Sequence, residues 1–301
     1  MPSLDSHLLK IAQQSAQQFV RMNKAALHAG KLFCLQITLD TQIIKMKTFK
    51  TIALLVLLAL PMMVSAGNND AGLIIGAEAE KKLNKKLSLA IEAEFRSRND
   101  FRTADRISLG LNSSYKITKW LKAELGYQLL IDNNHEKISY NAPTIDEDGN
   151  KVVNYNNWRP SYWGTRHRFY VLLTGSYKLN RVEFSLREGW RYTYRPEHTA
   201  KRYDFDNAMW EDKVINTKHY HILRSRFKVE WDIPKWKLDP WASIELFNNL
   251  SLDKIRYAAG IDYTIKKKHA FSLFYRYQQV YDKDEEEGDI HDIGLSYKFK
   301  F

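Results

Sequence analysis

Apolar and polar residues alternate along most of the chain after residue 72. In the last segment, Ile290–Phe301, apolar side chains occupy every second position: Ile293, Leu295, Tyr297, Phe299 and Phe301. Strict alternation places the two sets on opposite faces of a β-strand. Eleven such segments can be traced, each close to the length of about ten residues that a tilted membrane-spanning strand needs. The pattern indicates no helix of consequence after Ala66.

The connections between these segments alternate between short turns and long polar stretches. Lys266–Lys268 is typical of the turns, and Asp132–Trp163, Arg195–Lys218 and Asp282–Asp289 are the longest stretches. A small hairpin is expected around Asp148–Gly149 within the first of them. Aromatic residues gather toward the segment ends, which suits girdles at two membrane interfaces. The pattern predicts an all-β fold, an antiparallel up-and-down transmembrane β-barrel of 10–12 strands with short periplasmic turns and long outer loops.

Two features do not fit this pattern. Eleven segments conflict with the even strand numbers of bacterial single-chain barrels. If the last strand ends at the periplasmic rim, the first segment must descend from the outside. Either a strand has escaped the pattern, or one segment lies outside the wall. Glu188 also falls on an apolar face between Leu186 and Trp190, so a bulge or a position near the aqueous rim is expected there.

Residues 46–66 have the three regions of a secretory signal peptide. Met46–Lys50 is basic, Thr51–Leu60 is apolar, and Val64–Ala66 offers small residues for cleavage. The apolar run is short for a membrane anchor, which needs about 20 residues. We therefore predict cleavage after Ala66. Because such a peptide normally begins at the initiator Met, residues 1–45 are expected to be a start-site artefact or a disordered extension, and residues 67–301 to be the barrel.

Composition changes this picture little. Residues 1–66 hold seven of the 46 Lys+Arg and two of the 35 Asp+Glu, so 39 and 33 remain after cleavage, a net charge of +6. This mild charge gives no reason to expect nucleic acid as a partner. Cys34 is the lone cysteine, so no disulfide can form within the chain. The negative mean hydropathy excludes a helical membrane protein but not a barrel, whose lumen-facing polar residues offset lipid-facing ones.

Charged side chains recur on the polar faces of the segments. A narrow barrel cannot keep them unpaired without a large desolvation cost. One hypothesis is a structural barrel whose lumen is braced by Arg–Glu pairs. The other is a narrow passive channel for small anionic solutes, which the surplus of Arg in the middle segments slightly favours. The expected lumen charge network is Glu92, Glu94, Arg96, Glu124, Arg166, Arg168, Glu183, Arg187, Arg224, Arg226, Glu230, Glu245, Arg256, Asp262 and Arg276.

The alternative is an outer-membrane lipid hydrolase or modifying enzyme, which needs a Ser and a His together on the outer wall. His167, His221, Ser113 and Ser225 face outward by alternation. His221 and Ser225 lie about 13 Å apart on one strand, too far to share a proton. His219 and His221 share a face, but no third metal ligand is evident. The sequence therefore predicts a protein that is not an enzyme, with no catalytic, cofactor or metal site.

Several short stretches have the character of a known family. They are Glu80–Leu89, Arg166–Phe169, Arg224–Arg226, Pro240–Glu245 and the closing Tyr297–Phe301. With them, the chain resembles the domain-of-unknown-function 2490 family of exported bacterial barrels over nearly all of residues 67–301. The resemblance implies a fold and a location but no established activity, so it carries over no functional residues.

The expected location is the bacterial outer membrane, after export and cleavage. The expected partners are outer-membrane lipids, the barrel-assembly machinery and, for a channel, a small anionic solute. The chain's ending resembles the C-terminal strand that this machinery recognises. Tyr297, Phe299 and Phe301 are therefore the expected assembly signal.

Overall fold

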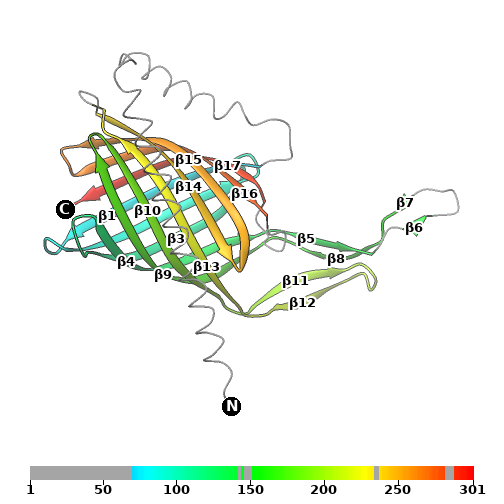
Figure 1. The fold of residues 1–301 in the computed structure, drawn as a ribbon. Helices are drawn as coiled ribbons and strands as arrows, with labels where there is room; N and C mark the ends of the chain where they lie inside the picture. The colour runs from blue at the N-terminus through cyan, green and yellow to red at the C-terminus, as the bar shows by residue number, and fades with distance from the viewer. Residues whose placement is uncertain (1–69, 142–143, 146–150, 234–236, 282–287) are drawn as a thin grey trace. The chain divides into compact units, whose positions relative to one another are not determined.

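The computed structural model describes residues 70–141, 144–145, 151–233, 237–281 and 288–301 (Figure 1). Within these ranges the chain is all-β, and eleven strands form a closed barrel. The predicted signal peptide and the segment before it lie outside the described residues. No helix in the described ranges is long and apolar enough to cross a bilayer.

The barrel strands coincide with the eleven segments expected from the alternation and are longer, at 11 to 18 residues each. Consecutive wall strands are antiparallel partners. In chain order they are β1 (Asp70–Lys82), β2 (Leu87–Arg98), β3 (Thr103–Lys116), β4 (Leu121–Asn134), β9 (Tyr162–Leu179), β10 (Val182–Arg195), β13 (Lys218–Trp231), β14 (Leu238–Asn249), β15 (Ser251–Ile265), β16 (His269–Val280) and β17 (Ile290–Lys300).

The seam between β1 and β17 resolves the odd strand count. These two strands pair in parallel, in register from Asp70 with Ile290 to Glu80 with Lys300. An odd number of alternating strands leaves the first and last pointing the same way, and the slanted hydrogen bonds of a parallel pair can join them. Lys298 Nζ lies 2.8 Å from a carboxylate oxygen of Glu78 and 2.6 Å from one of Glu80 across the seam. All eleven segments therefore belong to the wall, and within the described residues the wall contains no further strand.

Connections at the rim where β17 ends are short, as predicted. At the other rim, the connections from β4 to β9, β10 to β13 and β16 to β17 are long. Two connections at that rim are tight: Asn99–Arg102 joins β2 to β3, and Leu250 joins β14 to β15. Left-handed backbone at Asn99 (φ 53°) and Leu250 (φ 65°) lets the chain reverse within a few residues. The outer rim therefore combines long loops with tight turns.

Two of the predicted long loops fold into strands of their own. β5 (Lys137–Tyr140) and β8 (Tyr155–Arg159) follow β4, and β11 (His198–Asp204) and β12 (Met209–Ile215) follow β10. Together they form a four-stranded sheet in the order β12-β11-β8-β5. β6 (Thr144–Ile145) pairs with β7 (Lys151–Val152) as the expected small hairpin, whose tip lies outside the described residues.

An apolar row crosses this outer sheet. Trp210, Tyr203, Trp158 and Ile138 are successive register partners on the four strands. The rings of Trp158 and Trp210 lie 5.6 Å apart, and those of Tyr203 and Trp210 lie 5.3 Å apart. Such cross-strand aromatic contacts are a main source of sheet stability. They explain why segments that read as polar loops are ordered strands.

The barrel wall has an apolar outer face. Ile91, Leu111 and Leu125 alternate outward and are 62 %, 57 % and 61 % exposed. Water-soluble proteins seldom expose many large apolar side chains side by side, whereas the lipid-facing wall of a membrane barrel does. Tyr and His pairs lie toward the strand ends. One hydrogen bond joins Tyr192 Oη to His219 Nδ1 (2.7 Å), and another joins Tyr297 Oη to His269 Nδ1 (2.8 Å). This arrangement fits the predicted aromatic girdles.

The inner face is polar but contains a few large buried side chains. Phe247 and Leu130 are almost completely buried there. The ring of Tyr170 lies against Gly126 on the adjacent strand β4, where a Cβ atom would collide with it. The glycine leaves room for an inward ring, so the lumen is narrowed by side chains rather than open at full width.

Candidate functional site in the barrel lumen

The lumen contains a cavity of about 600 Å³ that side chains from all eleven wall strands line. Twelve cationic side chains and five carboxylates line it, a surplus of seven positive charges. The cations are Arg96, Arg106, Arg166, Arg168, Arg191, Arg224, Arg226, Lys228, Lys254, Arg256, Arg276 and Lys298. The carboxylates are Glu78, Glu92, Glu94, Glu245 and Asp262. We call this space the inner cavity.

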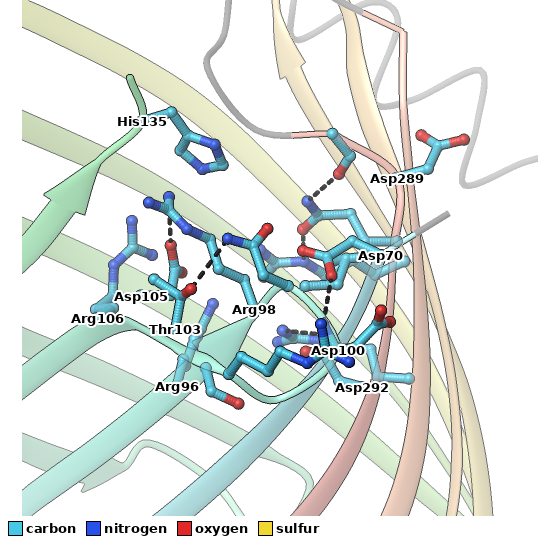
Figure 2. Close-up of a pocket in the computed structure, with 18 residues that line it drawn as sticks. Asp70, Arg96, Arg98, Asp100, Thr103, Asp105, Arg106, His135, Asp289 and Asp292 are labelled. Atoms are coloured by element: carbon cyan, nitrogen blue, oxygen red, sulfur yellow. Dashed lines mark hydrogen bonds and ion pairs between the residues drawn. The ribbon is translucent and has the colours of Figure 1, made fainter. Parts of the chain in front are cut away.

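A second cavity of about 920 Å³ lies where the turn between β2 and β3 meets the start of β17 (Figure 2). Six arginines and five aspartates line it, so its charges nearly balance. The arginines shared by both cavities are Arg96, Arg106, Arg256 and Arg276. The two spaces therefore share four guanidinium groups, and cations outnumber carboxylates more strongly among the residues that line the inner cavity.

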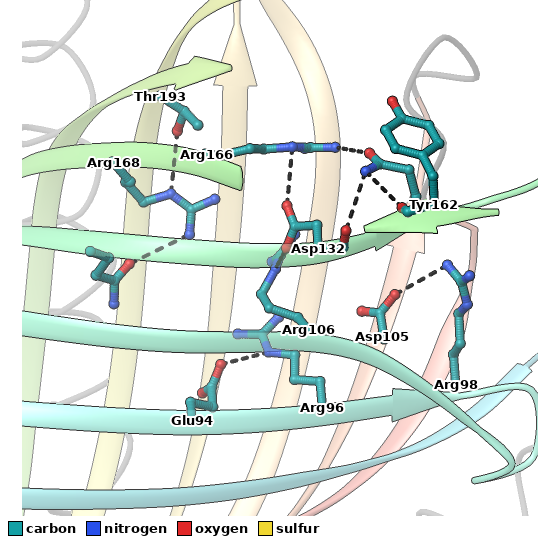
Figure 3. A network of polar contacts seen from close by, with 12 residues as sticks. Glu94, Arg96, Arg98, Asp105, Arg106, Asp132, Tyr162, Arg166, Arg168 and Thr193 are labelled. Carbon is teal, nitrogen blue, oxygen red and sulfur yellow. Dashed lines mark hydrogen bonds and ion pairs between the residues drawn. The ribbon is translucent and has the colours of Figure 1, made fainter. Parts of the chain in front are cut away.

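One ion-pair network ties three neighbouring strands together (Figure 3). Asp132 on β4 pairs with Arg106 on β3 and, at 3.0 Å, with Arg166 on β9. Arg166 also donates to Asn134 Oδ1 at 3.0 Å. The side chains of Asp132 and Arg106 are 6 % and 9 % exposed, so mutual attraction must offset a substantial desolvation cost. These pairs join β3, β4 and β9 through an aspartate, Asp132, that was not in the predicted set.

Further ion pairs cross the wall elsewhere. Arg224 on β13 pairs with Glu245 on β14, as expected of an Arg–Glu brace. Arg276 on β16 pairs with Asp292 on β17 at 2.7 Å. Within β2, Arg96 contacts Glu94 at 2.6 Å. Asp132 on β4 and Asp292 on β17 continue the alternation that places other residues of these strands inward. Following this alternation to the strand ends would have added both aspartates to the predicted charge network.

The other predicted network residues find mainly neutral or lysine partners. Their contacts are Glu92 with Gln128 (2.5 Å), Glu124 with Lys122 (3.2 Å), Arg168 with Thr193 (3.3 Å), Arg187 with Thr174 (3.2 Å), Glu230 with Lys228 (2.7 Å), Arg256 with Gln278 (2.7 Å) and Asp262 with Ser272 (2.5 Å). Within the described ranges, Glu183 and Arg226 form no hydrogen bond or ion pair. The Arg–Glu bracing is thus partial: Arg187 contacts a neutral hydroxyl, and Arg226 has no ion pair within the described ranges.

Phe247 marks a site that sequence reasoning missed. Its ring is completely buried on the inner face of β14. Four cationic groups surround it: Arg256 at 4.6 Å from the ring centroid, Arg191 at 5.5 Å, and Arg224 and Lys254 at 5.6 Å. Alternation did place Phe247 on the inner face, but nothing in its own strand indicates that β10, β13 and β15 bring charges to it. We call these five residues the Phe247 cluster.

The outer wall gives no Ser–His arrangement in the described part of the chain. Ser225 donates to Glu188 at 2.6 Å, and the two residues are direct partners between β13 and β10. The register is unbroken around Glu188, so the bulge expected there is absent. His167 bonds to Tyr127 at 2.8 Å, and His221 stacks on Trp190. The described residues also contain no group of three metal-ligating side chains.

Comparison with known proteins agrees with the sequence resemblance. The model of a family described as a protein of unknown function, DUF2490, matches residues 75–288. The chain is similar in structure to the beta domain of the Bordetella autotransporter Brka, with 12 % identity over 70 % of this chain and 79 % of that chain and a TM-score of 0.41. It is also similar to the translocator domain of autotransporter NalP from Neisseria meningitidis, with 13 % identity over 76 % of this chain and 91 % of that chain and a TM-score of 0.38. A third similar structure is the NanC porin, with 11 % identity over 76 % of this chain and 95 % of that chain and a TM-score of 0.36. No curated protein matches the sequence.

Proposed function

We propose that this chain, which belongs to the DUF2490 family, is an integral outer-membrane β-barrel that forms a narrow passive pathway for small anionic solutes. The observation that carries the proposal is that twelve cationic side chains but only five carboxylates line the inner cavity, and that Arg191 and Arg226 among them form no ion pair with a described residue. The ion pairs around it brace the wall, so the lumen is both braced and positively charged.

The membrane location rests on the outer face. Exposed aliphatic side chains on the wall lie between strand ends that have Tyr–His pairs, the arrangement expected where a barrel contacts a bilayer. Tyr297 and Phe299 pack on His269, and Phe299 packs on Phe301, so the last strand ends in a continuous aromatic group. We propose that this ending is the signal for the barrel-assembly machinery and that the exposed aliphatic side chains contact outer-membrane lipids.

The preference for anions follows from electrostatics. A unit charge about 8 Å away contributes about 2 kcal/mol at an effective dielectric constant near 20. Two guanidinium groups in the cavity, those of Arg191 and Arg226, have no ion pair with a described residue, and they therefore attract anions and repel cations. Bracing alone would not need cations without an ion pair, because a buried cation is best stabilised by a carboxylate of its own. Arg226 is informative, since it has no ion pair within the described ranges although it lines the cavity.

The test is ion selectivity. We would express the full-length chain, extract the protein from membranes and record currents across a planar bilayer with a salt gradient. The expected result is unitary current steps whose reversal potential indicates anion preference. The variant Arg226→Gln should reduce this preference without stranding a carboxylate. The matched control, Arg202→Gln in the outer sheet, removes the same charge from a residue that pairs with Glu211 outside the barrel wall.

A silent barrel would contradict the proposal. If the protein is inserted and shows the heat-modifiable migration of a folded barrel, yet passes no current, the lumen is closed and the braced structural role holds. Current steps that favour cations would also refute the anion pathway.

A further inference from the structure

The five carboxylates that line the inner cavity are not equally matched by cations. Four of them have a cationic partner, in the pairs Glu78–Lys298 (2.8 Å), Glu94–Arg96 (2.6 Å), Glu245–Arg224 and Asp262–Lys228 (3.7 Å). Glu92 is the exception, because its carboxylate accepts a hydrogen bond from the neutral side-chain amide of Gln128 at 2.5 Å and forms no ion pair within the described residues. One negative charge at the cavity wall therefore has no cation of its own.

The neighbouring strands hold Glu92 in this position without neutralising it. Its side chain lies over Gly110, its register partner on β3, where an added Cβ atom would collide with the carboxylate. Gln128 is the register partner of that glycine on β4 and donates to Glu92 from there. The glycine makes room for the side chain and the amide orients it, so the carboxylate is fixed at the wall with its charge intact.

The opposite wall has an unmatched charge of the other sign. Arg226 on β13 lines the same cavity and forms no ion pair within the described residues. Around the closed barrel, four strands separate β2 from β13 on one side and five on the other, so the two strands face each other across the lumen. Glu92 lies five positions after Leu87, where β2 begins, and Arg226 lies five positions before Trp231, where β13 ends at the same rim. A carboxylate and a guanidinium group, each without an ion pair, therefore stand on facing walls.

Unmatched charges of opposite sign favour a solute that carries both signs. An anion without a cationic group satisfies Arg226 but is repelled by Glu92. A solute with a carboxylate and an ammonium group matches both walls, because a guanidinium fork fits a carboxylate and an ammonium group donates to one. A second acidic group keeps the solute anionic, as the proposed pathway requires.

We infer that the inner cavity binds an acidic amino acid, with the ammonium group of the solute at Glu92 and a carboxylate at Arg226. The inference rests on the proposed anion pathway, whose solute class it narrows. The cavity of about 600 Å³ is within the size range of small-ligand sites. Glu92 determines the specificity, because it favours anions that carry an ammonium group over anions that do not.

The test compares L-glutamate with glutarate, which has the same carbon chain and both carboxylates but lacks the ammonium group. Isothermal titration calorimetry on the detergent-extracted full-length protein should show glutamate binding about tenfold to a hundredfold tighter than glutarate, the range expected for one hydrogen bond between charged groups. Attraction of negative charge alone predicts the opposite order, because glutarate has the larger net negative charge. Equal affinities, or tighter binding of glutarate, would refute the inference.

Variants of the two facing residues assign the contacts. Glu92→Gln keeps the size of the side chain and an oxygen that accepts from Gln128, and it should abolish the preference for glutamate. Arg226→Gln should weaken the binding of both solutes, because both present a carboxylate. The matched control Glu211→Gln removes a carboxylate that pairs with Arg202 outside the barrel wall, and it should bind both solutes as the unaltered protein does. A glutamate preference that survives Glu92→Gln would place the ammonium group elsewhere and contradict the assignment.

Bilayer recordings separate this inference from the proposed function. Glutamate should reduce the chloride current of a conducting barrel at lower concentrations than glutarate does, and Glu92→Gln should remove this difference. Anion-selective current without a preference for glutamate would overturn the inference and leave the pathway standing. Preferential glutamate binding by a barrel that passes no current would overturn the pathway and support the site.

Discussion

The substitution Asp132→Asn tests the bracing network most directly. It removes the negative charge between Arg106 and Arg166 while keeping the size of the side chain. Asp132 and Arg106 are 6 % and 9 % exposed, and Arg166 is 19 % exposed, so water can compensate little. Removing one partner of a buried ion pair typically costs about 3–5 kcal/mol. Because the amide oxygen can still accept a hydrogen bond, we expect a loss near the lower end, about 3 kcal/mol.

Urea unfolding of the reconstituted protein, followed by tryptophan fluorescence, measures this loss. With a slope of about 3 kcal/mol per molar urea, a loss of about 3 kcal/mol lowers the midpoint by roughly 1 M. The control is Asp232→Asn at the opposite rim, where the pair with Lys178 spans 3.3 Å and the side chains are 63 % and 52 % exposed. Exposed pairs of this kind contribute about 0–1 kcal/mol.

The comparison between these two variants decides the argument. If Asp132→Asn shifts the midpoint no more than Asp232→Asn does, the buried network does not brace the barrel. The same variant removes one negative charge beside the lumen and so makes the net charge there more positive by one, and anion preference in bilayer recordings should increase or stay equal. A fall in anion preference would contradict the electrostatic reasoning even if the stability result agreed.

Two further predictions concern packing and pH. Gly126→Ala should lower the free energy of unfolding, measured with urea, by about 1–3 kcal/mol, because the added Cβ collides with the Tyr170 ring. The control Gly175→Ala, which has open space around the added Cβ, should lower it less, and equal losses would refute the packing argument. In the outer sheet, the side-chain amide of Asn207 donates to Asp204 at 2.9 Å and lowers the pKa of Asp204 below its ordinary value of 3.8. The resulting stabilisation is present above pH 3.8 and is lost as the pH falls through the lower folded-state pKa. NMR titration should therefore show the pKa of Asp204 rising in Asn207→Ala, and an unchanged pKa would contradict this cause.

Alternation in the sequence predicted which face each wall residue occupies. It placed Arg224 and Glu245 inward, and the structure brings them together as a pair. It also identified eleven segments, and the structure has eleven wall strands. This success has a simple cause: side chains on a strand have a period of two, so the face of each residue follows from local sequence alone.

Alternation could not predict partners across strands. Arg166 pairs with Asp132, and Arg276 pairs with Asp292, because the barrel sets a register between strands that the local pattern does not contain. A shift by two residues would preserve every face and change every pair. The predicted lumen charge network therefore consists of charged residues that do face inward, but only some of its arginines pair with a glutamate, as Arg224 does with Glu245.

The loops show the same limit in another form. Asp132–Trp163 and Arg195–Lys218 read as polar loops because neither has enough alternating apolar residues to define a strand by itself. The outer sheet forms because β8 from one loop pairs with β11 from the other, which aligns Trp158 with Tyr203. The stabilising contacts lie between segments far apart in the chain, so neither segment alone reveals them.

By itself, the sequence determined the wall strands, their inward and outward faces, the turns at one rim and the charged character of the lumen. Tertiary structure decided the parallel closure of β1 on β17, the identity of the ion pairs and the gathering of four cations around Phe247. The division follows from the range of the forces involved. The period of two is a property of each strand, whereas closure, register and the balance of charge depend on which strands become neighbours in the barrel.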